Sequence, residues 1–121
     1  MAIEFSIEDR RIGADAHLVA VSGEVDLFTA PEFKQRVMAA IAGGAERVIV
    51  DFTKTTFVDS SSLGVLIGAH RRLKSRGGRI VIACDTDAIV KTFRITGLDG
   101  VFTLVPTLEE ALDESTGAEA A

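Results

Sequence analysis

Five segments of the chain carry the apolar pattern of β-strands. The two early segments alternate apolar and polar residues or run apolar, and the three later ones are short, apolar and rich in β-branched residues. They are residues 3–10, 17–23, 47–52, 79–84 and 101–105. Because a Gly-Ala-Asp stretch lies between the first two, they are predicted to form an early hairpin or strand pair.

Between these strands, apolar residues recur at the spacing of amphipathic helices. The predicted helices are residues 29–44, 60–76, 87–97 and 107–115. Thr29 suits the N-cap of the first helix and Pro31 its first turn, and pairs of glycines follow the first two helices. Because alternating strands and helices need crossover connections, the sheet is predicted to be mostly parallel, with the early pair as an antiparallel edge.

These elements predict a single α/β domain over residues 1–121. Its sheet is mixed and mostly parallel, with four to five strands, and about four helices accompany it. The core is expected to span residues 3–113. Residues 114–121 are expected to form a frayed C-terminal tail, because the end of the chain is small and polar.

Charge and composition disfavour several classes of protein. A net charge of -5 argues against a direct nucleic-acid partner. No apolar run approaches the roughly 20 residues that span a bilayer, and the N-terminus lacks a signal-peptide pattern, so we expect a cytoplasmic protein without membrane insertion. Cys84 is the single cysteine, and His17 and His70 lack the spacing of metal ligands or of a catalytic arrangement. We therefore expect no metal, no cofactor and no catalytic residues.

Three consecutive serines, Ser60, Ser61 and Ser62, follow Asp59 where the second predicted helix begins. One side-chain oxygen is enough to cap a helix, and Asp59 or Ser60 can supply it. A helix start also presents unpaired N–H groups and a partial positive charge, which can hold a phosphate. The triplet therefore has two interpretations, a helix cap alone or a helix cap that includes a phosphoacceptor serine.

One side of the second helix carries glycines, and each costs roughly 1 kcal/mol of helix stability relative to alanine. A helical projection places Ser61, Gly64, Val65, Gly68 and Arg72 on a face opposite the apolar stripe. We interpret this face as a candidate partner-binding surface that another chain approaches closely. The alternative, that the glycines pack against the domain's own loops, stands about even on these residues alone.

Three stretches of the chain, in order, resemble a known family. The run "RVIVDF", "TKTTFV" and "DSSSLGVLIGAHRRLKSRGGRIVIA" resembles the signature of anti-sigma factor antagonists, bacterial single-domain members of the STAS family, whose usual form is Asp-Ser-Ser-Gly-Leu-Gly. Upstream, "GEVDLFTA" resembles their Gly-Glu-Leu-Asp stretch, and downstream "VKTFRITGLDGVFTLVPTLEEAL" resembles their closing helix, strand and helix. The likeness covers essentially residues 3–113 and implies a STAS-like domain.

The resemblance implies a partner-switching regulator and not an enzyme. An unmodified antagonist binds an anti-sigma factor that is also a serine kinase, which frees a sigma factor. The kinase then phosphorylates the antagonist with ATP, and a metal-dependent, PP2C-like phosphatase restores it. By this resemblance the acceptor maps to Ser60, with Asp26 and Asp59 near it. Without the resemblance, Asp26 is an ordinary capping or turn residue.

Ser62 departs from the family pattern, because glycine is usual at its position. It adds a third hydroxyl beside the acceptor, although Ser60 stays preferred over Ser61 and Ser62. Two other functions stay open. The chain could be a constitutive STAS scaffold subunit of a stress-signalling or transport complex. It could also be a small α/β enzyme or ligand-binding domain that holds an anion at the serine-rich helix start.

Overall fold

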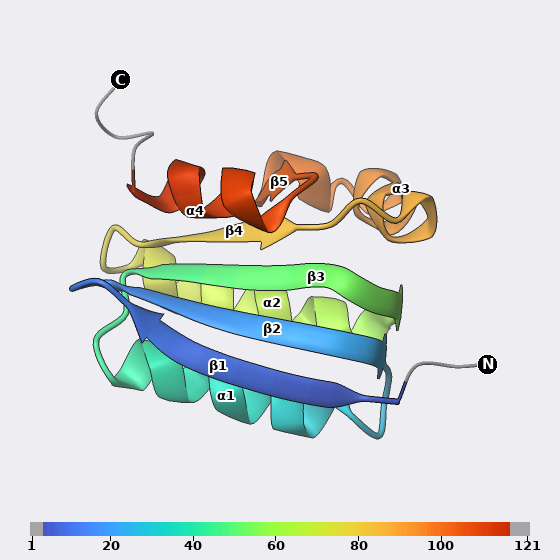
Figure 1. The fold of residues 1–121 in the computed structure, drawn as a ribbon, viewed down its shortest axis with the longest axis horizontal. Helices are drawn as coiled ribbons and strands as arrows, with labels where there is room; N and C mark the ends of the chain where they lie inside the picture. The colour runs from blue at the N-terminus through green and yellow to red at the C-terminus, as the bar shows by residue number, and fades with distance from the viewer. Residues whose placement is uncertain (1–3, 117–121) are drawn as a thin grey trace.

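One mixed sheet forms the centre of the protein (Figure 1). The computed structural model describes residues 4–116, with side chains through residue 113. The strands are β1 (Ser6–Ile12), β2 (Ala16–Val25), β3 (Arg47–Val58), β4 (Arg79–Ala83) and β5 (Thr103–Val105). They lie side by side in sequence order, β1 antiparallel to β2 and the remaining neighbours parallel. The predicted mostly parallel sheet with an antiparallel edge is confirmed.

Helices cover both faces of this sheet. They are α1 (Ala30–Ala42), α2 (Ser60–Lys74), α3 (Asp87–Ile95) and α4 (Leu108–Thr116), with a short 3-10 helix, η1 (Leu98–Gly100), before β5. Figure 1 shows α1 and α2 behind the sheet. On the other face, Ala111 of α4 packs in a small apolar cluster with Leu18 and Ile49. The predicted α/β class with four helices is therefore confirmed.

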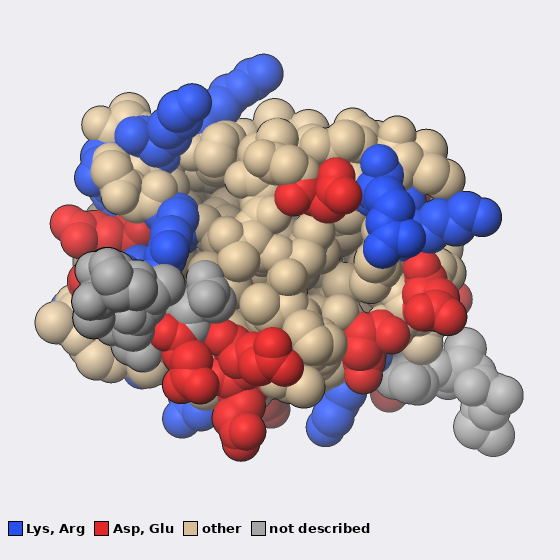
Figure 2. Space-filling model, turned by 90° about the horizontal axis from the view of Figure 1, so that it is seen from above, with Lys and Arg blue, Asp and Glu red and all other residues tan. Residues whose placement is uncertain are grey.

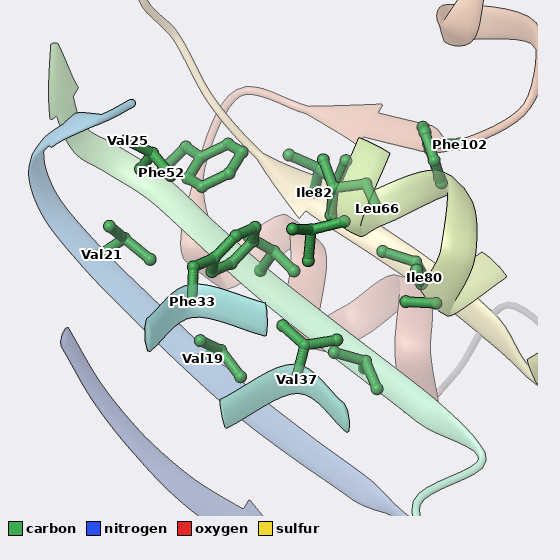
Figure 3. Packing of buried hydrophobic residues seen from close by; sticks show 14 of the residues in the cluster. Val19, Val21, Val25, Phe33, Val37, Phe52, Leu66, Ile80, Ile82 and Phe102 are labelled. Carbon is green, nitrogen blue, oxygen red and sulfur yellow. The ribbon is translucent and has the colours of Figure 1, made fainter. Parts of the chain in front are cut away.

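The main core lies between the sheet and the pair α1 and α2 (Figure 3). Phe33 and Val37 of α1 are fully buried, and the Phe33 ring lies 5.7 Å from the Phe52 ring of β3, centroid to centroid. Leu66 of α2 and Val19 of β2 are also fully buried in this cluster. Because burying one such side chain stabilises the fold by about 1.5–3 kcal/mol, this packing fixes both helices against the strands.

The strand β3 is longer than the sequence pattern predicts. The segment 53–58, expected to be a linker between a strand and a helix, continues β3 to Val58. β-Bulges in the β2–β3 pairing accommodate the extra residues, and the buried Thr55 hydroxyl donates to the Val21 carbonyl at 2.8 Å. The predicted strand stops at residue 52 because the extension depends on bulged pairing with β2, which the local pattern does not show.

Element ends differ from the sequence-based boundaries by a few residues. β5 begins at Thr103 and not at 101, because η1 and a turn occupy the preceding residues. α4 continues through Thr116, so residues 114–116 of the expected frayed tail are helical. The rest of that tail, residues 117–121, lies outside the described residues, as does the expected start of the first strand at Ile3.

Candidate functional site

Two aspartates leave the sheet next to each other at the carboxyl ends of β2 and β3. Val25 and Val58 are partners in the parallel register, and Asp26 and Asp59 follow them. The Asp59 N–H donates to the Val25 carbonyl at 3.3 Å, which ties the two strand ends together. Figure 1 shows these ends where α1 and α2 begin. Parallel pairing therefore places both sequence-predicted aspartates at one edge of the sheet.

Asp59 caps α2. Its Oδ1 accepts hydrogen bonds from the Ser61 N–H at 2.9 Å and the Ser62 N–H at 3.3 Å. Its own carbonyl accepts from the Leu63 N–H at 3.2 Å. The N–H groups at a helix start have no partner within the helix, so this carboxylate satisfies two of them. Asp59 supplies the cap that the sequence assigned to either Asp59 or Ser60.

The three serine side chains have different surroundings. Ser60, the first residue of α2, is exposed, and no described residue forms a hydrogen bond with its hydroxyl. Ser61 is partly buried. Ser62 is fully buried, and its hydroxyl donates to the Val25 carbonyl at 2.6 Å. The sequence predicted a third hydroxyl beside the acceptor, but the structure turns this one inward to β2, while Ser60 faces solvent.

Asp26 organises the turn between β2 and α1. Its Oδ1 accepts from the Phe28 N–H at 2.9 Å and from the Thr29 N–H at 3.1 Å, and its carbonyl accepts from the Ala30 N–H at 2.8 Å. Thr29 occupies the N-cap position of α1, as predicted, but its hydroxyl makes no cap hydrogen bond and donates to the Glu24 carbonyl instead. Asp26 is thus a turn-forming residue, and this role does not depend on any partner.

The turn that Asp26 forms presents two large apolar side chains to solvent. Leu27 is 68% exposed and Phe28 is 88% exposed. Sequence reasoning missed both, although "DLFTA" offers a signal, because two bulky apolar residues follow a strand and precede a helix cap. Isolated apolar residues on a surface need no explanation, but two together beside the exposed Ser60 helix start suit an interaction site.

A groove runs between the start of α1 and the glycine-bearing side of α2. It has a volume of about 530 Å³. Its walls are Leu27, Ala30, Pro31, Lys34 and Met38 on the α1 side and Ser61, Gly64, Val65 and Gly68 on the α2 side. The structure therefore brings together four of the five residues on the predicted outward face. Arg72, the fifth, is exposed but does not line the groove.

The two glycines of this face have different neighbours. A Cβ atom at Gly64 would meet nothing within 4 Å, whereas one at Gly68 would lie 3.6 Å from the Met38 Cε of α1. Val65 is buried, so the prediction that it points outward was wrong. The projection allowed for one buried side of α2, but α2 packs against both the sheet and α1, and Val65 lies near the second contact.

Cys84 and His70 pack against other residues of the domain. Cys84 is buried, as expected of a core cysteine, and burial raises the pKa of its thiol to about 11. His70 contacts the Phe102 ring edge-on, with 5.7 Å between centroids. Within residues 4–116, no three His, Cys, Asp or Glu residues gather into a group that could bind a metal ion.

Charges of both signs are spread over the surface. Figure 2 looks onto the α4 and β5 side and shows most acidic side chains along the lower margin, basic ones towards the two ends and a largely uncharged middle. Of the helices in the described part of the chain, none has the length and apolar character needed to cross a membrane. In the same part, none of the ion pairs includes Asp26 or Asp59. Among the described residues, no cation therefore pairs directly with either of these two aspartates.

Comparison with known proteins shows the family. The STAS domain family matches residues 9–111. The anti-sigma-B factor antagonist of Listeria monocytogenes is 30% identical over 99 residues, covering 82% of this chain and 87% of that protein.

Solved structures show the same fold. An anti-sigma factor antagonist from Mycobacterium paratuberculosis is 27% identical and has a TM-score of 0.78, covering 93% of this chain and 94% of its own. The anti-sigma factor antagonist SpoIIAA in its unphosphorylated form is 25% identical and has a TM-score of 0.79, covering 94% and 97%. The Bacillus protein SpoIIAA in its phosphorylated form is 25% identical and has a TM-score of 0.70, covering 92% and 98%. This chain belongs to the STAS domain family.

Proposed function

We propose that this protein is a bacterial, cytoplasmic anti-sigma factor antagonist that works by partner switching. The unphosphorylated form binds an anti-sigma factor with serine kinase activity and releases a sigma factor. Phosphorylation of Ser60 ends this binding, and a PP2C-like phosphatase restores it. The protein acts as the substrate in both reactions and catalyses neither. The names of its relatives, which include antagonists in phosphorylated and unphosphorylated form, support this role.

The observation that carries the proposal is the position of Ser60. Its hydroxyl is exposed at the first residue of α2, while Asp59 holds the N–H groups of Ser61 and Ser62. A kinase can reach this oxygen without unfolding the helix. Ser61 is partly buried and Ser62 is fully buried with its hydroxyl bonded to Val25, which favours Ser60 as the acceptor.

Electrostatics explain how one phosphate could switch binding off. Phosphoserine carries about -1.5 to -2 charges at neutral pH. At Ser60 this charge would be added next to Asp59, the preceding residue, and close to Asp26 at the end of the adjoining strand. Because no described cation pairs with either aspartate, both carboxylates would repel the new charge. A partner that binds the neutral hydroxyl closely would lose affinity without any large change in shape.

The groove beside Ser60 supplies a suitable partner surface. It borders the exposed Leu27 side chain, and Gly64 leaves its α2 wall open. Glycine is costly in a helix, and no neighbour within the domain requires it at position 64, so close approach by a partner explains it. At Gly68 an added Cβ would lie 3.6 Å from Met38 Cε, an ordinary van der Waals contact, so the domain does not require glycine there either.

The decisive experiment incubates the protein with ATP and candidate anti-sigma kinases from the same organism. Intact mass and phosphopeptide mapping locate the phosphate, and pull-downs compare the two forms. We expect one phosphate on Ser60 and at least about a tenfold loss of affinity, because a charge buried against a close partner is strongly unfavourable. Ser60→Ala should bind and resist phosphorylation, whereas Ser61→Ala should still take up one phosphate. Tight binding that ATP does not change would support a constitutive scaffold instead.

The partner surface is tested separately with Gly64→Leu. The added side chain projects into the groove and should weaken binding of the unphosphorylated form. Ala42→Leu, at the exposed last residue of α1, is the matched control because it adds a leucine outside the residues that line the groove. Equal affinity of the two variants would remove the groove from the interface and leave the Ser60 switch to be judged by the phosphorylation assay.

A further inference from the structure

The Ser62 hydroxyl joins the start of α2 to the end of β2. Ser62 is 0% exposed, and its Oγ donates to the Val25 carbonyl at 2.6 Å. The same carbonyl accepts the Asp59 N–H at 3.3 Å. Ser62 Oγ also lies 3.4 Å from Asp59 Oδ1. One carbonyl of β2 therefore holds both the capping residue of α2 and the third residue of its first turn.

Capping alone does not account for this hydroxyl. Asp59 already accepts from the N–H groups of Ser61 and Ser62, so α2 begins without help from the Ser62 side chain. Burying a hydroxyl is unfavourable unless it finds a partner, and alanine or glycine would avoid that cost. Glycine is the usual residue here in the signature that this segment resembles. The hydrogen bond to Val25 is the contact that the serine adds.

That contact reaches the exposed apolar turn. Val25 is followed by Asp26, whose carboxylate accepts from the N–H groups of Phe28 and Thr29. The turn that carries Leu27 and Phe28 is thus held by Asp26, and Asp26 is held next to α2 through the Val25 carbonyl. A displacement of the first turn of α2 is transmitted through Ser62 to this anchor.

A negative group at Ser60 would disturb the same first turn. It would compete with the Asp59 carboxylate for the N–H groups at the helix start and repel that carboxylate. Asp59 is bonded to Val25 through its N–H, and Ser62 is bonded to the same atom. The chain of contacts from Ser60 to the turn therefore passes through two hydrogen bonds that share one acceptor.

We propose that Ser62 is a positioning residue that couples the charge state of Ser60 to the placement of the exposed turn at Leu27 and Phe28. This rests on the proposed function, because the turn adjoins the groove assigned to the partner. Phosphorylation would then act twice, through repulsion at Ser60 and through a shift of the apolar turn. Removing the Ser62 hydroxyl leaves the first effect in place and weakens the second, because the Asp59 N–H still donates to the Val25 carbonyl.

The test uses the isolated protein and backbone amide NMR. Ser60→Asp supplies a fixed negative charge, and the shifts that it causes at Leu27, Phe28 and Thr29 are measured with and without Ser62→Ala, as a double-mutant cycle. We expect Ser62→Ala to reduce these shifts by about twofold or more. Ser75→Ala is the control, because it removes an exposed hydroxyl that donates to the Arg72 carbonyl at the far end of α2, and should leave the shifts unchanged. Ser62→Gly, which restores the family's usual residue, serves if Ser62→Ala folds poorly.

Equal shifts in the Ser62→Ala and Ser75→Ala backgrounds would overturn the proposal. So would the absence of any shift at the turn when Ser60→Asp is made in the otherwise unaltered chain. Neither result depends on a kinase or partner. A chain that no kinase phosphorylates would contradict the proposed function and leave this coupling intact, so the two failures are distinguishable.

Discussion

The carboxylates of Asp59 and Asp9 have different partners, although both are partly buried. Asp59 accepts backbone N–H groups at the start of α2 and forms none of the ion pairs found within the described residues. Asp9, in β1, accepts from His17 at 2.7 Å and from the Arg36 guanidinium of α1. Arg36 also lies 3.5 Å from Glu32, one turn earlier in α1. The Asp59 carboxylate is therefore satisfied by backbone N–H groups, and the Asp9 carboxylate by a histidine and an arginine side chain.

This difference separates a site that can respond to charge from one that holds the fold together. A cation beside Asp9 compensates its charge, so the Asp9 cluster fastens β1 to α1. Asp59 and Asp26 accept hydrogen bonds but form none of the ion pairs among the described residues. A phosphate nearby therefore adds its negative charge to theirs. Three predictions test this contrast, from the largest expected effect to the smallest.

Replacing Asp59 with alanine should have the largest effect on stability. It leaves the N–H groups of Ser61 and Ser62 without their acceptor, and losing such a cap costs about 1–2 kcal/mol. Asp59→Asn keeps an oxygen acceptor and should recover most of the loss. Urea unfolding of both variants provides the measurement. If asparagine proves as damaging as alanine, the negative charge and not the hydrogen bonding of Asp59 is what α2 requires.

Replacing Asp26 with alanine should have a smaller effect, about 0.5–1 kcal/mol, because the Phe28 and Thr29 N–H groups lie in an exposed or partly exposed turn that water can reach. The change should be local. Hydrogen exchange should accelerate at Phe28 and Thr29 and stay unchanged in the middle of α2. Acceleration throughout α2 would contradict a local role for Asp26.

Periodicity and helix signals were enough to predict most of the fold and the start of α2. The five strands and four helices follow from apolar spacing, because each element buries one face or both against a single sheet. The beginning of α2 follows from an aspartate before three serines. The length of β3 could not be predicted, since it depends on bulges against a strand far away in the sequence.

The parts of the site that sequence could not predict are those set by contacts between distant segments. Ser62 is buried because the Val25 carbonyl, 37 residues earlier, lies against the first turn of α2. Val65 is buried because α1 flanks α2, and a projection of one helix contains no information about its neighbour. Parallel register also brings Asp26 beside Asp59, which spacing along the chain does not reveal. Tertiary packing overrode the local pattern at these positions.

The smallest of the three effects is the pH dependence that Asp9 contributes. The hydrogen bond from His17, and then that from Arg36, lowers the pKa of the Asp9 carboxyl below its ordinary 3.8. With the folded-state pKa depressed, the unfolded chain binds more protons in this range, so Asp9 stabilises the fold above about pH 4 and its contribution disappears as the pH falls through the lowered pKa. Because the pair with Arg36 is partly exposed, we expect about 0.2–1 kcal/mol.

Asp9→Asn is the variant that measures this contribution, because asparagine cannot titrate. Its unfolding free energy should fall below that of the unaltered protein at about pH 7. The gap should narrow as the pH falls below about 4 and close once the pH passes the lowered pKa, where Asp9 itself becomes protonated in the folded state. Asp59→Asn measured over the same range tests whether the cap lacks this ion-pair signature. A gap that stays constant with pH would mean that the charge of Asp9 adds nothing to folding through His17 and Arg36. The contrast between the two aspartates would then depend on Asp59 alone.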